Sequence, residues 1–363
     1  MNVDSSQKRT SGNPDEKPNL FKFATKELSQ DAFLAWFLSW AASAYREHNP
    51  KLHEAAVAFV RKLISVTDSS PVEIKTVKVR RQFENIDVWC EVNESHIILI
   101  EDKVYSGQHS NQLVRYQDFA QRWCTEHPRE LVCIYIKTQS DSEANLNAVK
   151  RQGFSVFSRR ELLSLLDKFQ VCSDIYIDFR ESLREIEIRE SQFNRKRIAE
   201  WNRDDWKGFY RALEQRGLVR NWSYVPNPSG GFLAAILNWY DVNGIPLFMQ
   251  IEQNKLSFKI GEVRSDRRDL RKRFHTALMK NVIPELPLER PGRFGSGAYM
   301  TVAIVRSEAW LGCANDVVDL DIVIVRLQQY QSWLEGLLGE LRSMLIQRGG
   351  PADSPTVNGH SSQ

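Results

Sequence analysis

At Val72 the spacing of apolar residues changes from helical to strand-like, and it stays strand-like up to Lys103. This change most constrains the fold that the chain can adopt. The run VEIKTVKVR alternates apolar and charged residues, as a half-buried strand does. Two more strand-like runs, 85–92 and 96–103, are joined only by Asn93-Glu94-Ser95, which indicates a hairpin. The segment therefore predicts a meander of three strands.

Helical patterns surround these strands. Residues 25–48 have apolar residues at helical spacing, and Asn49-Pro50 is a typical start for the next helix. After the hairpin, a helical pattern at 107–127 leads into an apolar run at 131–137 that is typical of a buried strand. A helix near 144–151 and a strand at 154–157 complete a mixed α/β domain that ends near residue 170.

The second half of the chain has its own pattern. Segment 316–347 begins as a strand or a helix and continues as an amphipathic helix, whose apolar stripe is more often core than an oligomer seam. Before it, turn-forming residues separate four strand-like runs, at 230–240, 246–253, 255–262 and 298–306.

A highly charged, helix-favouring segment lies between the halves. Such a segment is usually a solvated helical face or a connector, and both ends of the chain are polar with little to bury. We therefore expect a disordered lead-in at 1–19, an α/β domain at 20–172, a charged helical connector at 173–216, an α+β accessory domain at 217–348 and a disordered tail at 349–363.

Composition narrows the class of protein. The five cysteines are scattered without a Cys-x-x-Cys pair, which argues against a zinc site and favours a reducing compartment. The N-terminus lacks the apolar core of a signal peptide, and no apolar run approaches the ~20 residues that span a bilayer. We expect a soluble, cytoplasmic protein with no membrane partner. Its net charge of +3 is nearly neutral, so any nucleic-acid contact must come from local clusters of Lys and Arg.

The predicted hairpin has a register that can be counted. If Asn93-Glu94-Ser95 is the whole loop, Val92 faces His96 and Asp87 lies opposite Glu101. Because strand side chains alternate, Lys103 shares a face with Glu101, whereas Asp102 points to the other face. A slip of one residue would undo this arrangement.

Two carboxylates at one site repel each other, which is costly unless a cation or a shared proton relieves the repulsion. The motif has oxygen ligands and no neighbouring Cys or His, which suits Mg²⁺, with Mn²⁺ as a substitute. A nearby lysine can orient or help deprotonate the attacking water and stabilise charge on phosphorus oxygens. Asp87, Glu101 and Lys103 together therefore indicate phosphodiester hydrolysis.

Asp87 followed by Glu101-Asp102-Lys103 on the next strand resembles the catalytic core of the PD-(D/E)XK nuclease superfamily. The resemblance implies a restriction-endonuclease-like mixed sheet flanked by helices, with the second α+β domain as an addition that matches no family we can name. By this resemblance Asp87, Glu101 and the carbonyl of Asp102 ligate the metal, and Lys103 is the catalytic lysine. Ile86 occupies the position of the Pro in the family name, and this position varies among members of the superfamily.

Two further parts of the sequence fit the resemblance. Gln112 and Tyr116, four apart on a predicted helix, resemble the Gln-x-x-x-Tyr motif of the RecB-like branch and would position substrate or the lysine. Many such enzymes also carry an acidic residue on the helix before the sheet, which makes Glu27, with Asp31 second, a candidate for the metal site. Taken alone, each of these residues is as well explained by an ordinary surface or helix-dipole role.

The densest basic run, 264–275, is weaker evidence for a nucleic-acid contact. A helix there places four arginines on adjoining faces able to meet phosphates, although nearby aspartates make a merely solvated helix equally reasonable. These arginines are Arg264, Arg267, Arg268 and Arg271.

The sequence thus predicts a Mg²⁺-dependent nuclease, with DNA favoured over RNA as substrate. The accessory domain would bind nucleic acid or a regulatory protein, and a homo-oligomer is left open. The alternative is an inactive nucleic-acid-binding or assembly module with a nuclease-like fold. Endonucleolytic action and a role in phage defence are suggested by analogy alone.

Overall fold

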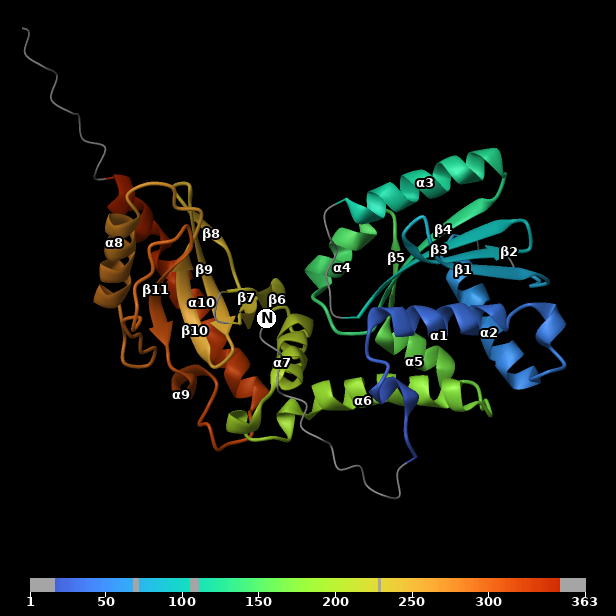
Figure 1. Ribbon diagram of the computed structural model, residues 1–363. Helices are drawn as coiled ribbons and strands as arrows, with labels where there is room; N and C mark the ends of the chain where they lie inside the picture. Colours follow the sequence, from blue (N-terminus) through green and yellow to red (C-terminus); the bar gives the residue numbers. More distant parts are fainter. Residues whose placement is uncertain (1–16, 68–71, 105–110, 228–229, 347–363) are drawn as a thin grey trace, which may run out of the picture. The chain divides into compact units, whose positions relative to one another are not determined.

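The computed structural model describes residues 17–67, 72–104, 111–227 and 230–346, and the chain divides into two compact units (Figure 1). The first unit comprises residues 1–141 and 145–188, and the second comprises 142–144 and 189–363. The predicted tail at 349–363 and the first sixteen residues of the predicted lead-in lie outside the described residues. Residues 17–19 are described, and the Asn19 side chain donates to the Asp178 carbonyl.

The first unit is built on a five-stranded mixed sheet. The three-strand meander is confirmed as antiparallel, and two further strands continue the sheet parallel to its third strand. In sheet order the strands are β1 (Val77–Phe83), β2 (Ile86–Val92), β3 (His96–Lys103), β4 (Glu130–Lys137) and β5 (Ser155–Ser158).

Helices cover both faces of this sheet, because its central strands are apolar on both sides. One face packs against α1 (Glu27–Ser39), α2 (Pro50–Ile64), α5 (Arg159–Leu166) and α6 (Asp174–Ser191). The opposite face packs against α3 (Gln112–Glu126) and α4 (Glu143–Lys150), as Figure 1 shows for α3. This confirms the predicted α/β class.

Single 3₁₀ turns occur in both units. They are η1 (Leu20–Lys22) and η2 (Ser43–Tyr45) in the first unit, and η3 (Gln192–Asn194) and η4 (Ile198–Glu200) in the second.

The second unit contains an antiparallel sheet and packed helices, as expected for α+β. Its sheet order is β11 (Met300–Val305), β10 (Lys255–Ile260), β9 (Ile245–Glu252), β7 (Phe232–Ile236) and β6 (Asn221–Val225), and β8 (Tyr240–Val242) pairs with β9. Its helices are α7 (Arg203–Gln215), α8 (Arg267–Lys280), α9 (Ser307–Trp310) and α10 (Leu320–Ile346).

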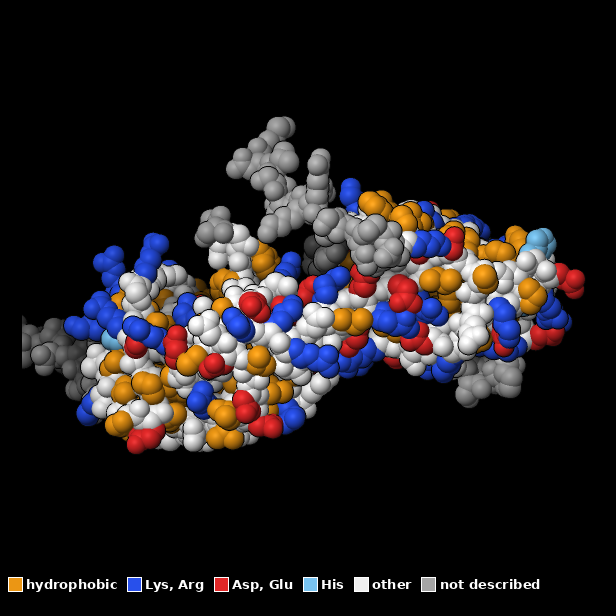
Figure 2. Space-filling model, turned by 90° about the horizontal axis from the view of Figure 1, so that it is seen from below, with side chains coloured by type: hydrophobic (Ala, Val, Ile, Leu, Met, Phe, Trp, Pro, Cys, Tyr) orange, Lys and Arg blue, Asp and Glu red, His pale blue; other side chains and the backbone are white. Residues whose placement is uncertain are grey.

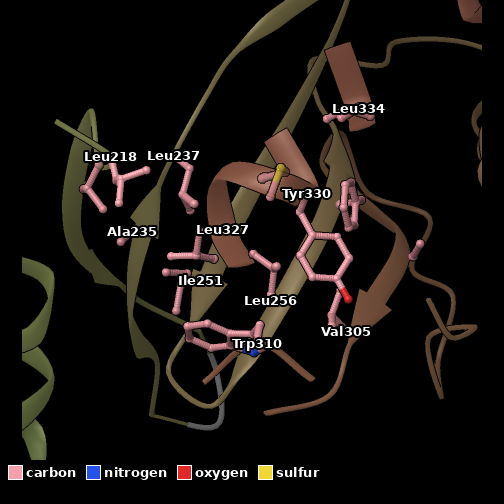
Figure 3. Close-up of a cluster of buried hydrophobic side chains, with 14 of the residues drawn as sticks. Leu218, Ala235, Leu237, Ile251, Leu256, Val305, Trp310, Leu327, Tyr330 and Leu334 are labelled. Carbon is pink, nitrogen blue, oxygen red and sulfur yellow. The ribbon is translucent and has the colours of Figure 1, made fainter. Parts of the chain in front are cut away.

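The core of the second unit forms between this sheet and α10 (Figure 3). Leu327, Tyr330 and Leu334 follow helical spacing along α10 and are fully buried, together with Leu256 of β10 and Trp310 of α9. Segment 316–347 therefore enters α10 as a helix, and of the two alternatives the strand start is wrong. Within the described residues, no helix is both long and apolar enough to cross a membrane.

The charged segment 173–216 differs from the expected solvated connector. Its helices α6 and α7 carry charges on one side, but Tyr176, Phe179 and Leu183 pack into the core of the first unit. On α7, Trp206 and Phe209 pack into the core of the second unit. The segment therefore supplies hydrophobic residues to both cores.

Strand boundaries also differ from the expectation. β1 begins at Val77 rather than Val72, because the amides of Lys75 and Thr76 donate to the Asn93 side chain instead of to a strand. The predicted run 230–240 divides into β7 and β8, since the Asn238 side chain accepts from the Met249 amide and interrupts the ladder.

Candidate active site

The predicted carboxylate pair lies where β2 begins and β3 ends. The register of this hairpin is confirmed: Val92 lies opposite His96, and the same register continued along the strands brings Asp87 opposite Glu101. Asp87 Oδ2 accepts the backbone amide of Asp102 at 2.9 Å, which fixes this carboxylate against the end of β3.

The Lys103 ammonium lies between these two carboxylates. Its Nζ is 2.6 Å from Glu101 Oε1 and 3.7 Å from Asp87 Oδ2, and it donates to the Asp102 carbonyl oxygen at 3.3 Å. Lys103 is only 7% exposed and Glu101 is fully buried. The structure therefore brings Asp87, Glu101, Lys103 and the main-chain oxygen of Asp102 to one point.

Burial dominates the electrostatics of this cluster. Desolvation and the nearby Asp87 charge raise the pKa of Glu101 to about 8, against the opposing effect of Lys103. Burial by itself would lower the pKa of Lys103, but the hydrogen bond and charge of Glu101 and the charge of Asp87 outweigh it and raise that pKa. A carboxyl that titrates near neutrality beside a lysine that stays charged is typical of a functional site.

A buried polar layer lies behind β3, on the side of α1. Asp102 points away from Glu101, as predicted, and its Oδ1 accepts a short hydrogen bond from Gln30 Nε2, whose own side-chain oxygen accepts from Thr138 at 2.9 Å. Burial and then the Asp31 charge raise the pKa of Asp102. Burial and the Asp87 charge likewise raise the pKa of Asp31 to about 6.

Gln82 connects this layer to the carboxylate pair. Its Nε2 donates at 3.2 Å both to Asp31 Oδ2 and to Asp87 Oδ1. The register of β1 and β2 places Gln82 opposite Asp87, and its φ of 53° lies in the left-handed region that non-glycine residues rarely adopt. Gln82 was not predicted as a site residue, although the two-residue turn Glu84-Asn85 determines this pairing.

Each of the three site residues predicted on helices, Glu27, Gln112 and Tyr116, forms a hydrogen bond in the structure. Glu27 Oε1 accepts the Val104 amide at 3.0 Å, so this carboxylate is bonded to the residue after Lys103. Gln112 and Tyr116 bond each other through Nε2 and Oη at 3.0 Å. Their helix α3 covers the sheet face that carries Glu101, and Tyr116 lines a hollow of about 470 Å³ with Glu84, Asn85, Arg115 and Phe119.

Residues 18–202, about half of the chain, match the family model of the PD-(D/E)XK nuclease superfamily. The chain belongs to this superfamily. The match contains the Asp87, Glu101 and Lys103 cluster and ends shortly before α7. No curated protein and no solved structure showed significant similarity to the chain. PD-(D/E)XK proteins are generally nucleases that use divalent metal ions, so membership suggests metal-dependent hydrolysis of nucleic acid.

The donor set at the cluster fits the metal ion that PD-(D/E)XK nucleases use. Among the described residues no group of three Asp, Glu, His or Cys side chains is placed so that the three could hold a metal ion. Two carboxylates and a carbonyl oxygen suit Mg²⁺, which keeps several waters and seldom has an all-protein cage. Glu101 Oε2 is buried without a hydrogen-bond partner among the described residues, so it is available as a ligand.

Lys137 is a second lysine on this face of the PD-(D/E)XK sheet, and it was not predicted from the sequence. In the parallel pairing of β3 and β4, Lys103 lies opposite Lys137 and Glu101 opposite Tyr135. Lys137 is buried, with its Nζ 3.9 Å from Asp141 Oδ2. Only the pairing of β3 with β4 reveals this position, because the two strands are far apart in sequence.

The predicted arginine cluster belongs to the second unit, outside the PD-(D/E)XK match. Arg267 Nε donates to the Val263 carbonyl at 2.9 Å, and Arg271 donates to the Gly295 carbonyl. Arg264 and Arg268 are exposed. The cluster thus contains two arginines that hold backbone and two that face solvent.

Proposed function

We propose that this protein is a Mg²⁺-dependent nuclease that hydrolyses phosphodiester bonds in DNA. One observation carries the proposal: the Lys103 ammonium lies 2.6 Å from a Glu101 oxygen and 3.7 Å from an Asp87 oxygen at the edge of a PD-(D/E)XK sheet. Two carboxylates and a lysine at one buried point are costly for a fold, which supports a chemical role rather than a structural one.

Asp87, Glu101 and the Asp102 carbonyl would hold the metal. A bound Mg²⁺ would supply positive charge that lowers the pKa of an attacking water and offsets charge on the phosphate. Gln82 orients Asp87 from outside the site, because its amide donates to the Asp87 oxygen that does not bind the Asp102 amide. Glu27 acts as a positioning residue that holds the Val104 amide beside the lysine.

Lys103 would serve as an electrostatic group. Its raised pKa keeps the ammonium charged at neutral pH, so it can donate to a phosphate oxygen but cannot accept the proton of the attacking water. Gln112 and Tyr116 would orient the substrate or the lysine, since their paired side chains belong to the helix over the same sheet face. Of the predicted cluster Arg264, Arg267, Arg268 and Arg271, the solvent-facing Arg264 and Arg268 are the proposed contacts of the second unit with the nucleic acid, since Arg267 and Arg271 donate to backbone carbonyls.

Digestion with the purified protein tests this function. In Mg²⁺ or Mn²⁺ the wild type should cleave duplex or single-stranded DNA faster than structured RNA, and chelation should stop cleavage. Asp87→Asn should abolish cleavage, whereas the matched control Asp118→Asn on the exposed part of α3 should not. Metal-independent cleavage, or equal activity in Asp87→Asn, would contradict the proposal. An intact fold that neither binds Mg²⁺ nor cleaves would favour the inactive binding module.

A further inference from the structure

The second unit has an exposed basic surface around α8 and the segment 290–299. Lys and Arg side chains gather at this end of the unit (Figure 2). Within the described part of the chain, none of the exposed cations at this surface forms an ion pair, so their charge is available to a ligand. They are Arg264, Arg268, Lys272, Arg290 and Arg293.

A glycine-containing loop, 292–297, is anchored to α8 beside these cations. Arg267 and Arg271 donate to the carbonyls of Ser296 and Gly295. The Phe294 ring has guanidinium groups on it from Arg271 at 4.7 Å and from Arg290 at 4.9 Å. Arg267 and Arg271 thus hold the loop that presents Arg293, whereas Arg264, Arg268 and Lys272 lie exposed beside it.

An aromatic row adjoins the basic loop. Tyr299, directly after the loop, is 52% exposed, and Trp239 is 36% exposed and stacks on Phe248 at 4.7 Å with an interplanar angle of 13°. Tyr299 meets Phe248 edge to face at 6.3 Å, so the three rings form one row. The loop and α8 are connected here, since the Val263 amide donates to Ala298 and the Val263 carbonyl accepts from Arg267.

We propose that this basic and aromatic surface binds a single strand of nucleic acid. Exposed cations would contact successive phosphates, while Tyr299 and Trp239 would stack with bases, which is how proteins bind single strands without reading sequence. An acidic peptide would use the charges but gives no reason for exposed rings next to them. The inference rests on the proposed function only in that both units would act on the same polymer.

Binding of a labelled single-stranded DNA in EDTA tests the surface without requiring cleavage. The test variant is Arg268→Ala with Lys272→Ala, and the matched control removes two exposed charges that follow α7, Arg216→Ala with Arg220→Ala. Helices α7 and α8 lie on opposite sides of the unit (Figure 1). The test variant should lower the slope of log affinity against log salt by about 1.4, because each phosphate contact on a single strand contributes about 0.7.

The aromatic part has its own test. Tyr299→Ala should weaken strand binding about tenfold, whereas Tyr299→Phe, which keeps the ring, should bind like the wild type, as expected when stacking carries the contact. Far-ultraviolet circular dichroism checks that each variant is folded. Equal affinity of Tyr299→Ala and Tyr299→Phe would overturn the stacking role.

The outcomes separate this inference from the proposed function. A test variant that binds with the same affinity and salt slope as its control would overturn the surface, even if the wild type cleaves DNA. Polyglutamate that competes as well as the oligonucleotide would also overturn it in favour of an acidic protein partner. Strand binding that depends on Arg268, Lys272 and Tyr299 would support it, even if no metal-dependent cleavage is found.

Discussion

Replacing Glu101 by Gln should stabilise the metal-free protein at high pH, although Glu101 belongs to the proposed catalytic site. Gln has nearly the shape of a protonated Glu but cannot ionise. Burial and Asp87 raise the pKa of Glu101 from an ordinary value of 4.5 to about 8. The folded state therefore binds a proton that the unfolded state has already released, and the metal-free wild type loses stability as pH rises from 4.5 to about 8.

The size of this effect follows from the pKa of Glu101. Because Glu101 is fully buried, solvent does not screen its charge and the full pKa shift counts toward stability. Each pH unit in the window costs the wild type up to about 1.4 kcal/mol of unfolding free energy, so the three units from pH 5 to 8 cost about 4 kcal/mol in total. Glu101→Gln removes this dependence. The free-energy difference between variant and wild type should therefore grow by about 4 kcal/mol between pH 5 and pH 9.

Urea unfolding at pH 5, 7 and 9 in EDTA measures this difference. Hydrogen exchange of β2 and β3 assigns the transition to the first unit. Glu126→Gln, an exposed change at the end of α3, is the control and should follow the wild type at every pH. Added Mg²⁺ should restore the wild type at pH 9 and leave Glu101→Gln unchanged. Parallel pH curves for the wild type and Glu101→Gln would refute the reasoning.

Three other substitutions test separate parts of the structure. Gln82→Ala removes the hydrogen bond that orients Asp87 and should weaken Mg²⁺ binding about tenfold or more in calorimetry, as loss of an outer-shell partner does; unchanged affinity would count against that role. Tyr116→Phe breaks the bond from Gln112 but keeps the ring in the core, so turnover should fall while the thermal midpoint changes little; turnover equal to that of the wild type would make the pair structural. Trp89→Ala deletes a fully buried ring that contacts three aromatic neighbours and should cost about 3–5 kcal/mol in denaturant unfolding; a loss below about 1 kcal/mol would mean that this face repacks.

The central hairpin could be predicted because local features determine it. A three-residue loop at 93–95 sets the register, and the two-residue period then assigns Glu101 and Lys103 to one face and Asp102 to the other. Non-local pairing could not be read from the sequence in the same way. The positions of Lys137 beside Lys103, and of Gln30 behind β3, depend on how separate segments pack together.

In the connecting segment 173–216, the many charged residues made part of the hydrophobic core hard to predict from the sequence. On α6, Tyr176, Phe179 and Leu183 are spaced as one helical stripe, but the surrounding Arg and Glu residues favour a solvated interpretation. Glu187 of α6 forms an ion pair with Arg159 at 2.6 Å. The charged side of α6 therefore has partners of its own, while the apolar stripe of the same helix is buried. A search for spaced aromatic residues within charged runs would have found this stripe.

The most direct test of the central claim measures metal binding and single-turnover DNA cleavage in Asp87→Asn and Lys103→Met. Asp87→Asn should lose both Mg²⁺ binding and cleavage, because it removes a proposed ligand. Lys103→Met should still bind Mg²⁺ but cleave at least about 100-fold more slowly, because it removes the group that stabilises developing charge. Cleavage at the wild-type rate by both variants would contradict the assignment of Asp87, Glu101 and Lys103 as the nuclease site.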